Sequence, residues 1–203
     1  MGQRICFYGD SFVQGIGDPE RRGWVGRVLA VSTGEVTGFN LGIRGNTSED
    51  VLRRCWPEAQ ERLVPGSDNR LVLSFGGSDA AEDRGGVRVR LSHTLENLGI
   101  LLDGCRRRAV EVMVVGPPPV IGAGPAHLDR VLELAGRMRE LCELKTVPFA
   151  DVTRELTGDA AWRDEVLAGD GAHPGSAGYD RLAGLVRAAG WQDWLDGWPD
   201  GYR

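Results

Sequence analysis

The chain has 203 residues, which is enough for one well-buried domain and too few for two of comfortable size. It carries 24 Lys and Arg against 29 Asp and Glu, a formal net charge of −5. The basic cluster Arg106–Arg108 falls where we expect a helix to end, and cations there suit the helix dipole. We therefore expect neither a nucleic acid nor an anionic membrane surface as a partner.

The cysteines fall inside apolar segments, without a CxxC pair and without a histidine at ligand spacing; they are Cys6, Cys55, Cys105 and Cys142. This pattern predicts buried free thiols in a reducing compartment, and neither a metal site nor a cofactor is expected. Before Gly9 stand Arg4 and four apolar residues, too few for a signal-peptide core. Since we also find no apolar run long enough to insert into a membrane, we expect a cytoplasmic protein.

Short runs rich in Val, Ile, Leu and Phe predict the strands, at 4–8, 35–40, 70–75, 111–115 and 147–150. The nearly continuous apolar character of 112–115 is typical of strands buried on both faces, as in a parallel sheet. Apolar residues at helical spacing predict the intervening helices, at 24–29, 47–56, 87–105, 127–144 and 176–189. Thr47 and Asp50 resemble a capping box at the start of the second helix.

Alternation of strands and helices predicts a three-layer α/β/α sandwich with a five-stranded, mostly parallel sheet. Because we find no linker or internal repeat, we expect a single domain over 1–203. The tail 190–203 is rich in aromatic residues, and the spacing of Trp191, Trp194 and Trp198 predicts that it packs against the domain. We expect Trp24 to lie nearer to a substrate than the tail does.

The carboxyl ends of parallel strands share one crevice, so the residues that follow each strand are candidates for a site. They are Gly9–Asp10–Ser11 after the first strand, 40–46 after the second and 76–79 after the third, with Asp170–Pro174 before the last helix. The triple proline 117–119 and the Gly-rich 121–124 leave the same edge and are expected to form a wall of the site.

A hydroxyl nucleophile needs a base within hydrogen-bonding reach and a third group that orients the base. Of the three histidines, His173 fits best, because it lies in a Gly- and Pro-rich loop with Asp170 three residues earlier. Taken alone, this pair also fits an ordinary surface loop at a helix entry. His93 is expected to be exposed, and His127 either contacts substrate or only begins a helix.

Together these stretches resemble the GDSL-type, or SGNH, hydrolase superfamily of serine esterases and lipases, over nearly the whole chain from Gly9 to Tyr179. The resemblance implies a flavodoxin-like fold and a catalytic triad of Ser11, Asp170 and His173. It also implies that the backbone N–H groups of Ser11 and Gly45 line the oxyanion hole. The stretch Asp170–Tyr179, DGAHPGSAGY, is very similar to the last block of that family.

One position departs from the family pattern. The third block normally reads Gly, any residue, Asn, Asp, and its asparagine donates to the oxyanion. Here it reads Gly76–Gly77–Ser78–Asp79, so the donor is a hydroxyl that is shorter and less preorganised. This change predicts slower turnover, a donor that acts through closer backbone or water, or loss of activity.

The sequence thus predicts a hydrolase that cleaves carboxylic esters through an acyl-enzyme, with a small-molecule acyl ester as substrate and without metal or cofactor. Two alternatives stay open. One is an acyltransferase or deacetylase acting on a sugar or natural-product intermediate, and the other is a binding module that lost catalysis through Ser78. The expected assembly is a monomer or a homodimer.

Overall fold

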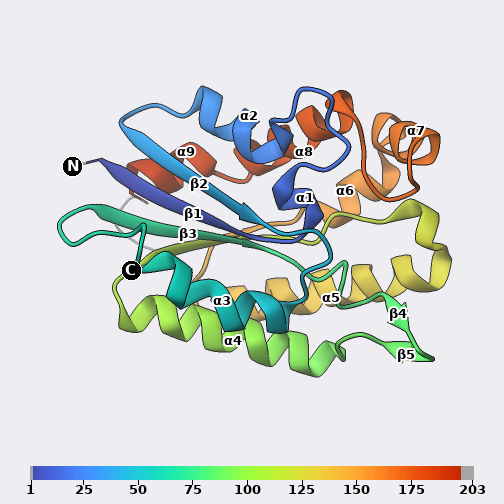
Figure 1. Ribbon diagram of the computed structural model, residues 1–203, viewed down its shortest axis with the longest axis horizontal. Coiled ribbons are helices and arrows are strands. Elements are labelled where there is room, and N and C mark those ends of the chain that lie inside the picture. The colour runs from blue at the N-terminus through green and yellow to red at the C-terminus, as the bar shows by residue number, and fades with distance from the viewer. Residues whose placement is uncertain (1, 198–203) are drawn as a thin grey trace.

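The computed structural model describes residues 2–197, which fold around one twisted sheet (Figure 1). The sheet has five strands in the order β2-β1-β3-β6-β7, and every pairing is parallel. The strands are β1 (Gln3–Gly9), β2 (Val36–Gly42), β3 (Asp68–Ser74), β6 (Glu111–Val115) and β7 (Phe149–Ala150). The predicted sheet is therefore confirmed, with the last strand shorter than expected.

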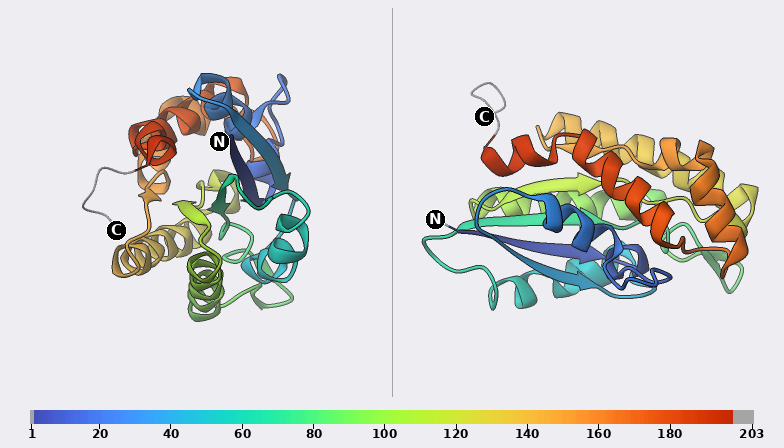
Figure 2. Two further views of the ribbon diagram at one scale, coloured as in Figure 1. Left: turned by 90° about the vertical axis from the view of Figure 1, so that its left-hand side faces the viewer. Right: turned by 90° about the horizontal axis from the view of Figure 1, so that it is seen from above.

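Helices cover both faces of the sheet, as the two turned views in Figure 2 show. One face carries α2 (Gly23–Val31), α6 (Thr153–Gly158), α7 (Ala160–Ala168), α8 (Ser176–Ala188) and α9 (Trp191–Asp196). The other face carries α3 (Ser48–Ala59), α4 (Leu91–Arg107) and α5 (Pro125–Leu144). Each face of the sheet has its own hydrophobic core. Alternate residues of β1 belong to one core or the other, because successive side chains of a strand point to opposite faces. Ile5 and Phe7 pack on the first side, and Cys6 and Tyr8 on the second.

The strand order creates the crevice for a site. From β1 the chain reaches β2 on one side, and it then returns to β3 on the other. The helices that follow β1 and β3 thus leave in different directions, which opens a gap at the carboxyl ends of these two strands. Ser11 follows β1 and Ser78 follows β3, so both lie at this edge.

The expected helix over 87–105 begins later, at Leu91, and the earlier start is wrong. Residues before it form a two-stranded hairpin of β4 (Glu82–Asp83) and β5 (Gly86–Val87). Its tip holds Arg84 at φ 51° and Gly85 at φ 86°, and positive φ at both tip residues matches the twist of a tight hairpin. Val87 fitted the helical spacing because a single apolar residue is compatible with both the helical and the strand pattern.

Local sequence signals elsewhere did predict the structure. Thr47 caps α3, and Thr47 and Asp50 form the reciprocal capping box. All four cysteines are buried free thiols. In the tail, Trp191 and Trp194 are buried as expected, whereas Trp198 and Tyr202 lie outside the described residues. Within 2–197, none of the helices has the length and apolar character that a membrane crossing requires.

Candidate active site

A sharp turn at the end of β1 places Ser11. Asp10 caps the short helix α1 (Ser11–Gln14), and its carboxylate accepts a hydrogen bond from Phe12 N at 3.0 Å. The turn folds back so closely that a Cβ at Gly9 would stand 1.9 Å from the carbonyl oxygen of Ser74. Glycine is therefore required there. Ser11 begins α1 with 7% of its surface exposed.

The loop before α8 brings His173 onto Ser11. His173 Nε2 lies 2.7 Å from Ser11 Oγ, and His173 Nδ1 lies 2.7 Å from Asp170 Oδ2. With Nδ1–H donating to the carboxylate, Nε2 is left to accept the hydroxyl proton of Ser11. The sequence separation between Ser11 and His173 is 162 residues, so only the fold joins the three predicted residues.

Hydrogen bonds also fix Asp170 in its charged form. Its Oδ1 accepts from the backbone N–H groups of Ala172, at 3.0 Å, and His173, at 2.9 Å. Burial raises the pKa of Asp170, but these bonds and the one to the His173 ring outweigh it and hold the pKa at about 2. The ring of Phe12 packs against the imidazole, with ring centroids 5.2 Å apart. The carboxylate and the aromatic ring thus both restrict the position of the imidazole.

The turn after β2 lies against α1. Ile43 N donates to Gly9 O at 3.1 Å, and Arg44 N donates to the side chain of Gln14 at 2.9 Å. Gly45 follows at φ 77°, a conformation that favours glycine, with open space where a side chain would stand. Gly45 lines the same pocket as Ser11.

The stretch after β3 forms the opposite side of the pocket. Ser78 is half-buried there, while Asp79 is buried and accepts from Ser48 N and the hydroxyl of Thr94. His127, near the start of α5, donates from Nε2 to the carbonyl of Gly77 at 3.0 Å. His127 therefore lines the pocket and also holds this stretch in place, whereas His93 is exposed on α4.

Asp10 is a second buried carboxyl beside the nucleophile, with only 2% of its surface exposed. Burial is the main cause that raises its pKa to about 7, and nearby Asp79 adds to the shift. Asp10 lines the pocket along with Ser11. A carboxyl group with this pKa changes its charge close to neutral pH. The sequence did not reveal this property, because Asp10 has the pattern of an ordinary helix cap.

These residues surround a pocket of about 520 Å³, a volume suited to a small molecule. Val120 and Ala123 line it, so the Pro- and Gly-rich loop forms a wall as predicted. Gly122 N donates to Gly171 O at 2.7 Å and joins this wall to the loop that carries His173. Among residues 2–197, groups of three or more His, Cys, Asp or Glu that could hold a metal ion are not found.

Trp24 is not among the residues that line the pocket, and the expectation that it lies nearer to a substrate than the tail does stays a prediction. Its side chain is fully buried and packs on Phe7, with ring centroids 5.8 Å apart, in the core between α2 and the sheet. The sequence reasoning instead missed the arginines Arg44, Arg88 and Arg130, which line the pocket. No local signal marks them, since they come from a turn, a hairpin end and a helix.

Comparison with known proteins agrees with this fold. The sequence model of the GDSL-like Lipase/Acylhydrolase family matches residues 7–181. A crystal structure of the lipase/acylhydrolase from Enterococcus faecalis superposes with a TM-score of 0.74 at 27% identity, covering 94% of this chain and 97% of the other. Axe2, an acetylxylan esterase from Geobacillus stearothermophilus, shares the fold with a TM-score of 0.69 at 20% identity, covering 93% and 94% of the two chains.

The chain therefore belongs to the GDSL-like lipase/acylhydrolase family, and its sheet and flanking helices are those of the SGNH hydrolase fold. An uncharacterized lipoprotein of Bacillus subtilis, YqeF, is 28% identical over 131 residues, which is 61% of this chain and 52% of the relative. This chain spans between about a third and a half of the length of the curated relatives that it matches.

Proposed function

We propose that the protein hydrolyses small carboxylic esters through an acyl-enzyme, with Ser11 as nucleophile, His173 as base and Asp170 as orienting acid. One observation carries the proposal: the chain of two 2.7 Å contacts that joins Ser11 Oγ, the two nitrogens of His173 and Asp170 Oδ2. Family membership supports the same class of chemistry.

In the first half-reaction, Ser11 Oγ forms a bond to the acyl carbon while His173 Nε2 takes the hydroxyl proton. Asp170 keeps the imidazole in the tautomer that accepts this proton and stabilises the cation that forms. The carbonyl electrons move onto oxygen and give a tetrahedral oxyanion. When they return, the bond to the alcohol breaks, and His173 passes its proton to the leaving alcohol.

In the second half-reaction, water gives a proton to His173 Nε2 and attacks the acyl carbon. A second tetrahedral intermediate collapses, the bond to Ser11 Oγ breaks, and the proton returns to Ser11. The products are a carboxylic acid and a free serine. The backbone N–H groups of Ser11 and Gly45, with the hydroxyl of Ser78, are the proposed donors to both oxyanions.

The test is hydrolysis of p-nitrophenyl acetate together with labelling by a fluorophosphonate, which reacts only with an activated serine. We expect Ser11→Ala and His173→Ala to lower kcat by at least about 10⁴-fold and to abolish labelling. Ser92→Ala and His93→Ala are matched controls, because both residues are exposed on α4 away from the pocket. They should keep wild-type rates.

Other outcomes separate the alternatives. Equal rates in wild type, Ser11→Ala and His173→Ala would contradict the proposal. A wild-type protein that is folded but neither labelled nor active would point to a binding module. Transfer of the acetyl group to an added alcohol, in preference to water, would point to an acyltransferase that uses the same serine.

A further inference from the structure

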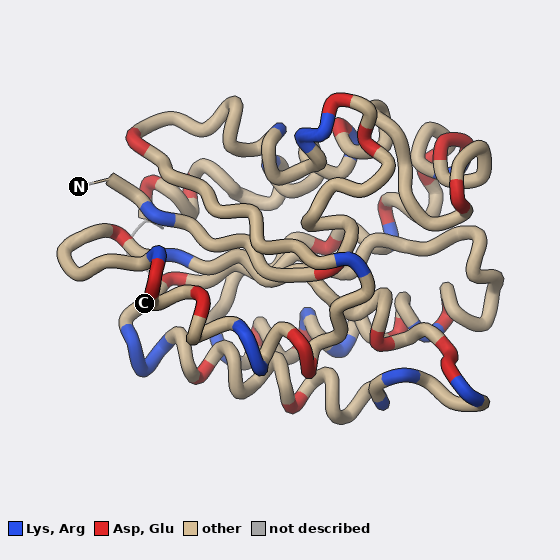
Figure 3. Tube along the Cα trace, in the orientation of Figure 1, with Lys and Arg blue, Asp and Glu red and all other residues tan. Residues whose placement is uncertain are grey.

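Three arginines from distant parts of the sequence line the pocket of Ser11. Arg44 lies in the turn between β2 and α3, Arg88 follows the β4–β5 hairpin, and Arg130 lies on α5. The chain as a whole is acidic, with a net charge of −5. In Figure 3 acidic and basic segments alternate over the surface helices, and basic segments lie on the hairpin and just after it. A group of arginines around one small pocket thus runs against the overall charge.

The acidic side chains of this pocket neutralise one of its three arginines and leave the other two. Glu82 Oε1 lies 2.9 Å from Arg130 Nη1, so these two residues neutralise each other. Arg130 Nε also donates to Ala80 O at 2.9 Å, which fixes that side chain in the wall. Asp10 is buried beneath Ser11, and its raised pKa, about 7, leaves it only partly charged near neutral pH.

Arg44 and Arg88 keep charge available for a ligand. The carboxylate near Arg44 is Asp170, 3.7 Å away, and the two side chains are 65% and 44% exposed. An exposed pair at that distance is weak, and Asp170 already accepts the hydrogen bonds of the His173 loop. Ion pairs among residues 2–197 include none for Arg88.

We propose that the substrate is an ester that also carries an anionic group, either a carboxylate or a phosphate. Arg88 and Arg44 bind this anionic group while Ser11 faces the ester carbonyl. A guanidinium presents two parallel N–H donors to such a group, which gives both affinity and orientation. The pocket volume of about 520 Å³ is enough to hold the ester and the anionic group of one small molecule together. This inference rests on the proposed function and names its substrate class.

The experiment compares kcat/KM for matched esters. The acyl side is probed by p-nitrophenyl hemisuccinate against p-nitrophenyl pentanoate, and the alcohol side by 4-acetoxyphenyl phosphate against phenyl acetate. We expect at least one anionic ester to exceed its neutral counterpart by about fivefold or more, the scale of one partly exposed charge contact. The preference should shrink in about 1 M salt, where the Debye length falls to about 3 Å.

Variants assign the preference to the arginines. Arg88→Gln and Arg44→Gln should each lower the anionic-to-neutral ratio about threefold to fivefold. Arg137→Gln is the matched control, because Arg137 is exposed on the same helix as Arg130 and pairs with Glu140 outside the pocket. It should leave the ratio unchanged. A wild-type ratio of one or less for both ester pairs, or a ratio that Arg88→Gln and Arg44→Gln do not alter, would overturn the inference.

Equilibrium binding separates this inference from the proposed function. The Ser11→Ala protein should bind intact p-nitrophenyl hemisuccinate or 4-acetoxyphenyl phosphate more tightly than the neutral counterpart, and no turnover is needed for that measurement. If wild type hydrolyses no ester, the proposed function fails and the binding ratio still decides the inference. If a neutral ester is hydrolysed through Ser11 but the anionic ones gain nothing in rate or binding, only the inference fails.

Discussion

The side chain of Ser78 lines the same pocket as Ser11, at the position where the family pattern given above has an asparagine. An amide N–H has its direction fixed by two torsions, whereas a hydroxyl hydrogen rotates and is shorter in reach. Around it, His127 holds the Gly77 carbonyl and Asp79 is fixed by Ser48 and Thr94, so the backbone of this stretch is rigid. Of the proposed oxyanion donors, the Ser78 hydroxyl is therefore the one whose direction is least fixed.

We predict that Ser78→Asn raises kcat for p-nitrophenyl acetate by about tenfold with little change in KM. Removing one oxyanion donor typically costs about 10²–10³ in turnover, so a better-aligned donor should recover part of that. Steady-state kinetics is the measurement, and Ser92→Asn on the exposed face of α4 serves as control. An unchanged kcat in folded Ser78→Asn protein would mean that the backbone donors already suffice.

At this scale the sequence predicted which residues gather at one pocket, but not the arginines around them. Ser11, Gly45, Ser78 and His173 each follow or precede a predicted element in a glycine-rich stretch, so strand-end reasoning locates them at one edge. Strand-end reasoning does not find Arg88, because its position depends on the β4–β5 hairpin, whose last residue Val87 also fitted the spacing of the expected helix. The charge of a pocket is a property of tertiary contacts.

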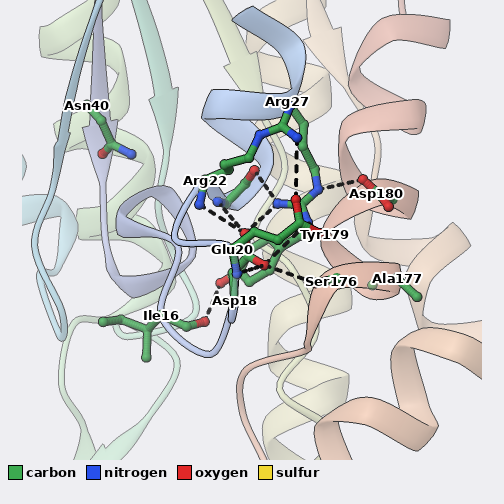
Figure 4. Close-up of polar contacts among 12 residues, drawn as sticks. Ile16, Asp18, Glu20, Arg22, Arg27, Asn40, Ser176, Ala177, Tyr179 and Asp180 are labelled. Atoms are coloured by element: carbon green, nitrogen blue, oxygen red, sulfur yellow. Dashed lines mark hydrogen bonds and ion pairs between the residues drawn. The ribbon is translucent and has the colours of Figure 1, made fainter. Parts of the chain in front are cut away.

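At the scale of elements, a buried ion pair holds the loop between α1 and α2 (Figure 4). The side chain of Asp18 is fully buried and pairs with Arg27 of α2, while it also accepts from Gly23 N at 2.8 Å. Arg27 Nε donates to Asp180 of α8 at 2.5 Å. The hydrogen bonds of Asp18 hold its pKa at about 2 against the effect of burial, so it is charged at neutral pH.

This network also supports the base. A Cβ at Gly17, one residue before Asp18, would lie 2.9 Å from His173 Cβ and 2.7 Å from Pro174 O. The loop therefore packs directly on the backbone of the segment that carries His173. Tyr179 of α8 donates from its hydroxyl to Ile16 O at 2.7 Å and tightens the same contact. The loop after the nucleophile's helix α1 is thus bonded to α2 and α8 and packed against His173.

We predict that Arg27→Met lowers the free energy of unfolding by about 3–5 kcal/mol, because it leaves the Asp18 carboxylate buried without its cation. The rate of fluorophosphonate labelling at Ser11 should fall as well, since the loop that packs on His173 loosens. Arg22→Met is the control from the same loop: its pair with Glu20 is 47% exposed on each side. Its loss should cost under about 1 kcal/mol. Urea unfolding measures the free energy of unfolding of both variants, and an equal loss of free energy in the two would contradict a special role for Arg27.

At the scale of the whole molecule, the two ends of the parallel strands have different roles. The pocket lies at the carboxyl ends, and α9 covers the amino ends. Arg70, in the first half of β3, donates to Leu195 O at 3.0 Å, and its guanidinium lies 4.9 Å from the Trp194 ring. Trp191 stacks on Phe7 of β1 with ring centroids 5.9 Å apart. The aromatic spacing of the tail predicted this packing, but not the edge that it covers.

We therefore predict that Trp191→Ala lowers the stability of the fold without changing the rate of the catalysed reaction. The variant should lower the free energy of unfolding by about 3–5 kcal/mol, as expected when a large buried aromatic side chain leaves a cavity. At temperatures where it is folded, its kcat and its rate of Ser11 labelling should stay within about twofold of wild type, because substitutions distant from a site act independently. Paired measurements of urea midpoint and kcat make the test. A loss of kcat beyond the fraction unfolded would mean instead that β1 transmits a change of packing at Phe7 to the turn after Gly9, where Asp10 caps the helix of the nucleophile.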